Sequence, residues 1–203
     1  SSHDAKRRFA VVVDSAADIP DAQLEELDIH IVPLRIQFGE HGFMDKVSIT
    51  PSEFFDELRT NPVHPTTSQP APGDFRRQFQ FLASHYPEVL SINVTEKVSG
   101  TYQAAVAATE RVDARGKVKV FDSRNASTGQ GMLAIHAARC ADNGQSLDDT
   151  LQELDALRER TRTYAILDDL RYAVRGGRVP GWGKVVADLA RMLLIIRTKP
   201  DGK

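Results

Sequence analysis

The sequence is poor in cysteine, in long apolar runs and in net charge, and each shortage excludes a class of protein. Cys140 is the only cysteine among 203 residues, which excludes an intramolecular disulfide and a zinc cluster built from several cysteines. No apolar run approaches the roughly 20 residues of a membrane helix, so we expect no stable membrane insertion. The formal net charge is −2, which offers no broad basic surface for nucleic acid. These features are typical of a cytoplasmic protein.

What the sequence does contain is an alternation of apolar runs and amphipathic helical segments. Strands are predicted at residues 9–13, 30–38, 89–94, 118–121, 164–167 and 195–197. Helices are predicted at residues 18–27, 51–58, 74–82, 101–111, 132–141, 147–157, 168–175 and about 184–194. This order indicates an α/β fold with a mostly parallel sheet. We expect an α/β domain at residues 9–160 and the incomplete start of a second α/β domain at residues 161–203. Some of the early segments could belong to the second domain, and the sequence does not decide this.

Local signals sharpen three of these segments. Asp18 is the expected N-cap of its helix, and Thr50 with Glu53 forms a capping box at the start of the next one. Pro33 lacks a backbone N–H and therefore predicts an edge position for its strand. Four prolines between residues 61 and 72 predict a stiff loop.

Polar residues follow three buried strands at the points where each strand ends. These segments are residues 14–15, 95–101 and 122–131. Ligands of parallel sheets bind at the carboxyl ends of the strands. Ser99, Gly100 and Thr101 lie between a strand and a helix, where free N–H groups and the helix dipole favour an anion. The alternative is that Ser99 or Thr101 only caps its own helix.

The proline-rich loop carries a second group of hydroxyls. Thr66, Thr67, Ser68 and Gln69 supply three hydroxyls and an amide from a stiffened backbone, which suits a polar clamp. The alternative is a surface loop whose hydroxyls bond their own backbone. The residues alone do not favour either interpretation.

Motifs for nucleotide or metal chemistry are weak. Gly129 and Gly131 resemble part of a phosphate loop, but the third glycine of the dinucleotide pattern is absent, as is a Gly-rich loop ending in Lys-Ser or Lys-Thr. Asp14 and Asp122 could bind Mg²⁺, although Asp-Ser at a strand end more often caps the next segment. A nucleotide-binding module therefore remains a third choice of function.

A few other residues give only weak signals of function. His136 and Cys140 are four residues apart on one predicted helix, which is more often packing than a ligand pair, and we expect no metal site. Arg175 suits the C-terminal end of a helix dipole, whereas Arg178 lies past the helix and is freer to meet an outside anion. Ser99 could be a nucleophile, but the sequence shows no evident base and no Gly-x-Ser-x-Gly elbow.

Several motifs taken together, in their order along the chain, resemble the DegV family of fatty-acid-binding proteins, which includes the binding subunits of bacterial fatty acid kinases. The matching segments are residues 13–20, 31–34, 49–54, 66–70, 99–105 and 176–179. The resemblance implies two α/β domains with a long acyl chain held between them.

The resemblance also implies roles for individual residues. Thr67 and Ser99 would hold the fatty acid carboxylate, with Thr66, Ser68, Gly100 and Thr101 as supporting loop residues. Arg178 would lie on the surface that meets a partner kinase. The chain would then be a carrier without catalytic residues, with a bound fatty acid as its ligand and no cofactor. The alternative is a small α/β hydrolase or phosphate-chemistry enzyme that uses Ser99 with Asp14 or Asp122.

Overall fold

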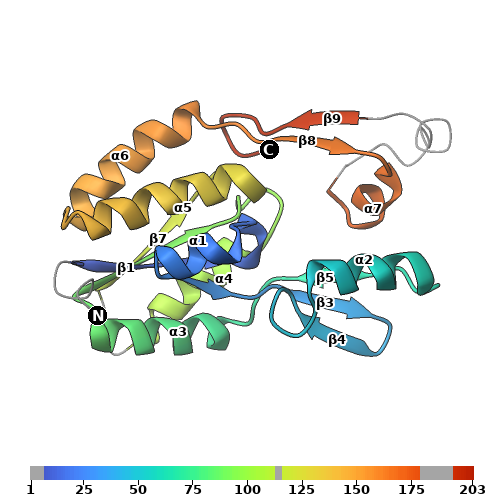
Figure 1. The fold of residues 1–203 in the computed structure, drawn as a ribbon, viewed down its shortest axis with the longest axis horizontal. Helices are drawn as coiled ribbons and strands as arrows, with labels where there is room; N and C mark the ends of the chain where they lie inside the picture. Colours follow the sequence, from blue (N-terminus) through green and yellow to red (C-terminus); the bar gives the residue numbers. More distant parts are fainter. Residues whose placement is uncertain (1–6, 113–115, 179–193) are drawn as a thin grey trace.

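A four-stranded parallel sheet forms the centre of the computed structural model, which describes residues 7–112, 116–178 and 194–203 (Figure 1). The strand order is β2-β1-β6-β7, and every neighbouring pair is parallel. The strands are β1 (Phe9–Asp14), β2 (Ile29–Val32), β6 (Glu88–Asn93) and β7 (Val118–Asp122). The prediction of an α/β fold with a parallel sheet is therefore confirmed.

Helices cover both faces of this sheet. They are α1 (Asp21–Glu26), α3 (Pro72–His85), α4 (Thr101–Thr109), α5 (Ser127–Asp142) and α6 (Leu147–Arg160). Helix α5 packs on β1, with α6 outside it, whereas α3 and α4 pack together on the opposite face (Figure 1). A short 3-10 helix, η1 (Ser15–Ala17), follows β1 directly.

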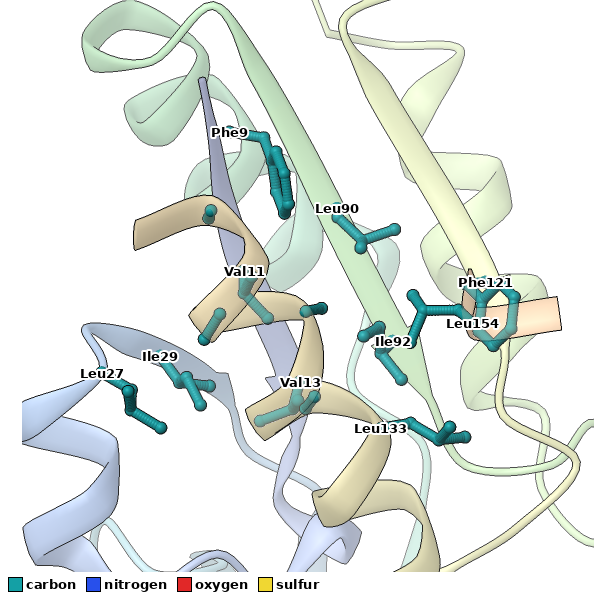
Figure 2. Packing of buried hydrophobic residues seen from close by; sticks show 14 of the residues in the cluster. Phe9, Val11, Val13, Leu27, Ile29, Leu90, Ile92, Phe121, Leu133 and Leu154 are labelled. Atoms are coloured by element: carbon teal, nitrogen blue, oxygen red, sulfur yellow. The ribbon is translucent and has the colours of Figure 1, made fainter. Parts of the chain in front are cut away.

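Strand β1 explains why the sheet has a core on each face. All six of its residues are buried, and successive side chains of a strand point to opposite faces. Phe9 and Val11 pack with Leu133 of α5 and other apolar residues on one face, as Figure 2 shows. Ala10 and Val12 belong to the cluster on the other face, which α3 and α4 cover. An uninterrupted apolar run is what a strand buried on both faces requires.

A second group of elements lies beside the sheet and has antiparallel strands. Its three-stranded sheet has the order β4-β3-β5, formed by β3 (Arg35–Phe38), β4 (His41–Met44) and β5 (Thr66–Ser68). A separate two-stranded antiparallel sheet is formed by β8 (Tyr164–Leu167) and β9 (Leu194–Arg197). The helices here are α2 (Pro51–Thr60) and α7 (Leu170–Arg175).

We call these two groups the parallel part (residues 7–33, 70–112 and 116–163) and the antiparallel part (residues 34–69, 164–178 and 194–197). Figure 1 shows α2 and β5 facing α7 within the antiparallel part. The division of the chain into domains at residues 160 and 161 stays a prediction.

The prediction of a single strand over residues 30–38 is wrong, because one strand ends at Val32 and a second begins at Arg35. β2 is an edge strand of the parallel sheet, as Pro33 indicated, but β3 belongs to the antiparallel sheet. Pro33 has no N–H for a ladder. The N–H of Leu34 bonds to Ser15 Oγ at 3.0 Å and not to a neighbouring strand.

Asp18 is not the cap of α1, which is a second correction. The N-cap residue is Pro20, and Asp18 has a positive φ of 50° just after η1. The Asp18 carboxylate accepts a hydrogen bond from Lys46 Nζ at 2.6 Å. This ion pair joins the start of α1 to the antiparallel part.

The capping box of α2 is confirmed, since Thr50 Oγ1 accepts from Glu53 N and Glu53 Oε2 accepts from Thr50 N. Strand β4 was not predicted, and β5 was predicted as a loop. The helix predicted at about 184–194 lies outside the described residues, apart from Leu194, which begins β9.

Candidate functional site

A pocket of about 700 Å³ opens between α2 and α7 in the antiparallel part. Its apolar side is formed by Phe54, Phe55 and Leu58 of α2, together with Leu167 and Tyr172 across the opening. The spacing of the three α2 residues places them on one helix face. This volume lies within the range of about 300–1,000 Å³ that is usual for small-ligand sites.

The polar end of the pocket contains Thr67 and Arg178. Thr67 lies in β5, where it pairs with Ile36 of β3. Arg178 Nη1 donates to Gly176 O at 2.8 Å, and Arg178 Nη2 donates to Thr67 Oγ1 at 3.3 Å. A cation and a hydroxyl therefore lie side by side at the rim, and both side chains are exposed.

His64 and Tyr172 tie the two walls of the pocket together. The imidazole ring of His64 stacks on the ring of Tyr172, with centroids 5.1 Å apart and planes 12° apart. Arg175 Nη1 of α7 also lies 3.4 Å from His64 Nδ1. Neither contact could be found from the sequence, because the two walls are more than 100 residues apart.

Ser99 lies in the turn before α4, outside the residues that line this pocket. Its Oγ accepts from Thr101 N at 3.2 Å and lies 2.7 Å from Thr101 Oγ1. Among the described residues, the hydrogen bonds found for Ser99 go only to Thr101. Ser99 therefore bonds the first residue of α4 without being its N-cap, which is Gly100, and no base is bonded to Ser99 in the described part of the chain.

Gln69 brings the two hydroxyl loops together. A Cβ added to Gly100 would lie 3.1 Å from Gln69 Cδ, so the amide of Gln69 packs directly on the backbone of Gly100. Thr67 lies two residues from Gln69, and Ser99 adjoins Gly100. The segment containing Thr66 and Ser68 and the turn before α4 are therefore neighbours.

Gly129 and Gly131 at the start of α5 are explained by close packing. A Cβ at Gly131 would lie 2.6 Å from the carbonyl oxygen of Ala17, and one at Gly129 would collide with Thr163 Oγ1. Gln130 between them is buried and donates to Ile92 O at 3.2 Å. These glycines allow α5 to approach its neighbours, which is a structural reason for the motif.

Asp14 and Asp122 both bond the backbone just beyond their strands. Asp14 Oδ1 accepts from Ala16 N at 3.1 Å, and Asp122 Oδ1 accepts from Arg124 N at 2.9 Å. Burial raises the pKa of both carboxyl groups above the ordinary value. The capping interpretation of the two Asp-Ser pairs thus agrees with their contacts.

Comparison with known proteins decides the family. The family model described as an uncharacterised protein of the DegV family matches residues 8–203. The chain belongs to the DegV family. A DegV domain-containing protein of Caldanaerobacter subterraneus is 35% identical over 196 residues, which cover 97% of this chain and 69% of that protein. Protein DegV of Bacillus subtilis is 34% identical over 189 residues, which cover 93% of this chain and 67% of that protein.

Solved structures of DegV proteins share the fold. A DegV family protein from Thermus thermophilus, described by its fatty acid binding, matches with a TM-score of 0.84 and 33% identity over 96% of this chain and 69% of its own. DegV from Bacillus subtilis, described as a fatty acid binding protein, matches with a TM-score of 0.84 and 32% identity over 95% of this chain and 68% of its own. Within the described residues, no helix of this DegV chain is long and apolar enough to cross a membrane.

Proposed function

We propose that this chain binds a long-chain fatty acid, with the tail in the pocket along α2 and the carboxylate held by the hydroxyls of Thr67 and Ser99. The observation that supports this most is the pocket itself, which has an aromatic and aliphatic wall at one side and Thr67 beside Arg178 at its rim. The two structural neighbours described above, at 32% and 33% identity, are both described by fatty acid binding.

Burial of the acyl tail supplies the affinity in this proposal. Each buried methylene contributes about 0.8 kcal/mol, so some fifteen of them give roughly 12 kcal/mol before losses. Ordering the flexible tail consumes a large share of that energy. The half-exposed ring of Phe55, which is 54% accessible, is one apolar surface that the tail would cover.

The carboxylate needs donors, because burying an uncompensated charge is costly. Ser99 can supply one when Thr101 Oγ1 is the donor in their shared hydrogen bond, since the Ser99 proton is then free. Ser99 Oγ already accepts from the N–H of Thr101, but Gly100, the N-cap residue of α4, has no side chain that could compete for the next N–H groups of the helix. Thr66, Ser68 and Thr101 would keep the two loops in place.

The first test is direct. Solvent extraction of the purified protein and mass spectrometry are expected to find a long-chain fatty acid, and titration of the delipidated protein is expected to show saturable binding. Thr67→Ala combined with Ser99→Ala removes two hydrogen bonds to a charged group, each worth about 1.5–3 kcal/mol. Thr60→Ala is the matched control, because Thr60 is an exposed threonine at the end of α2 that does not line the pocket.

The outcomes separate the parts of the proposal. Unchanged affinity in the double variant would reject the carboxylate assignment, even if binding itself is real. Absence of any fatty acid binding would reject the whole function. Turnover of esters or phosphates by the protein alone, abolished by Ser99→Ala, would support the enzyme alternative in its place.

We further propose that the chain is a carrier that presents the carboxylate to a partner kinase, which forms the acyl phosphate. Arg178 supports this role because it is an exposed cation that contacts Thr67, which places a positive charge within reach of a partner beside the proposed carboxylate site. Acyl phosphate is expected only when the chain, a fatty acid kinase and ATP are combined. Arg178→Ala is expected to lower its rate of formation far more than it lowers fatty acid affinity, and equal rates would reject Arg178 as a partner contact.

A further inference from the structure

Three side chains with metal-binding atoms converge on the outer side of the parallel part, away from the pocket. His136 and Cys140 lie four residues apart on α5, and therefore on one helix face. Glu153 comes from α6, which packs against α5. The three donor atoms lie within 4.8 Å of one another. The sequence alone gave only the His-Cys pair, because the third member depends on how the two helices pack.

The separations of these atoms are close to those around a tetrahedral zinc ion. Zinc bonds of about 2.3 Å to sulfur and about 2.1 Å to nitrogen or oxygen place sulfur about 3.6 Å from either atom, and nitrogen about 3.4 Å from oxygen. Cys140 Sγ lies 3.5 Å from His136 Nε2 and 3.7 Å from Glu153 Oε2. His136 Nε2 lies 2.7 Å from Glu153 Oε2, so only this contact must open when an ion enters.

Neighbouring groups already orient the carboxylate. Gln145 Nε2 donates to Glu153 Oε1 at 3.1 Å, which leaves Oε2 directed at His136 and Cys140. A hydrogen-bonded outer partner of this kind typically fixes a metal ligand.

The cluster also provides an entry path and a source of selectivity. The side chains of His136 and Glu153 are 37% and 48% exposed, whereas Cys140 is buried beneath them. Metal binding must displace the thiol proton of Cys140, because zinc is bound by the thiolate. A set of one sulfur, one imidazole nitrogen and one carboxylate oxygen favours zinc-like ions over magnesium or calcium.

We propose that His136, Cys140 and Glu153 form a binding site for one zinc-like divalent ion, with water or an outside ligand in the fourth position. The ion would link α5 to α6. This proposal does not depend on fatty acid binding, because none of the three residues lines the pocket. The ordinary alternative is a His136–Glu153 ion pair that covers a packed thiol.

The test uses the full chain after treatment with a chelator and a reductant. Titration with Zn²⁺ is expected to give one site per chain, and Co²⁺ is expected to give a thiolate-to-metal charge-transfer band. Cys140→Ala should abolish the band, and His136→Ala and Glu153→Gln should each weaken Zn²⁺ binding at least tenfold. The matched control is His30→Ala, because His30 also lies beside a carboxylate, that of Asp28, but without a thiol.

Two results would overturn the proposal. One is the absence of a stoichiometric Zn²⁺ site in the wild-type chain. The other is Zn²⁺ affinity that survives both His136→Ala and Cys140→Ala, which would place the ion elsewhere. If Cys140→Ala does not fold, Glu153→Gln and His136→Ala decide the matter, because both side chains are partly solvent-accessible and neither belongs to the apolar core.

Discussion

The parallel part of this chain buries most of its large apolar side chains, whereas the antiparallel part exposes many of its own. Most of the largest fully buried side chains belong to the parallel part: Phe9, Phe75, Phe79, Leu82, Leu90, Ile92, Leu133, Leu147 and Leu154. Most of the large apolar side chains that are exposed belong to the antiparallel part: Met44, Val47, Phe55, Val63, Tyr164, Ile166, Tyr172, Ile195 and Ile196. The first pattern is typical of a close-packed hydrophobic core, and the second is typical of a binding surface.

The β8–β9 pair shows the second pattern most clearly. Ile166 and Ile195 face each other across the two strands, and both are 69% exposed. An apolar ligand or partner surface gains energy from covering such residues, because roughly 25 cal/mol is released for each Å² of apolar area removed from water. The difference between the parts therefore suggests that stability resides in one and binding in the other.

The largest expected effect is on the core of the parallel part. Phe79 is fully buried and packs on Phe75, with ring centroids 5.6 Å apart. Phe79→Ala should lower the free energy of unfolding by about 3–5 kcal/mol, because it removes buried apolar area and leaves a cavity. Urea denaturation followed by circular dichroism measures this change. A loss below about 1 kcal/mol would contradict the view that the stability of the chain resides in the parallel part.

The parallel part also buries a carboxyl group, whereas the charged residues around the pocket stay near solvent. Asp14 is fully buried and accepts hydrogen bonds from Val94 N at 2.8 Å and Asn93 Nδ2 at 3.2 Å. Desolvation nevertheless raises its pKa above the ordinary value of 3.8. The folded state therefore holds the proton more tightly than the unfolded state does.

The pH dependence of stability follows from the sign of this shift. The stabilisation from protonated Asp14 is complete below the unfolded pKa and is lost as the pH rises through the folded pKa. Each unit by which the pKa is raised corresponds to about 1.4 kcal/mol. The stability of the wild type relative to Asp14→Asn should fall as the pH rises above the unfolded pKa of about 4, as urea titrations at several pH values would measure. A difference that stays constant over the whole pH range would show that the hydrogen bonds to Asp14 offset its desolvation.

The sequence was most informative where structure is local. The apolar run at 9–13 and the capping box of Thr50 and Glu53 were predicted correctly, because a buried strand and a helix start depend on neighbouring residues. Asp18 was predicted as a cap and instead pairs with Lys46, a contact that only the folded chain creates. Strand β5 was missed because three residues between prolines carry little strand signal, and their pairing with β3 is distant in sequence.

The candidate site was likewise predictable in its local features and not in its tertiary contacts. Residues of the two hydroxyl loops could be chosen from hydroxyls near a helix start and a stiff loop. Their proximity through Gln69 and Gly100 depends on tertiary packing, as does the contact of Arg178 with Thr67. The segment that forms the aromatic wall of the pocket was predicted only as a helix over residues 51–58, because periodicity does not reveal whether a helix face is covered by protein or by a ligand.

A substitution in the pocket wall should have little effect on stability but a clear effect on binding, which separates the roles of the two parts. Phe55 is 54% exposed, so Phe55→Ala should change the free energy of unfolding by no more than about 0.5 kcal/mol. The same substitution should weaken fatty acid binding in a direct titration, because the ring lines the pocket. Phe81→Ala is the matched control, since Phe81 is 57% exposed on α3 and lies outside that pocket. Equal loss of affinity in both variants would mean that the tail does not lie along α2, and a large loss of stability in Phe55→Ala would mean that the antiparallel part depends on its own exposed aromatic residues for folding.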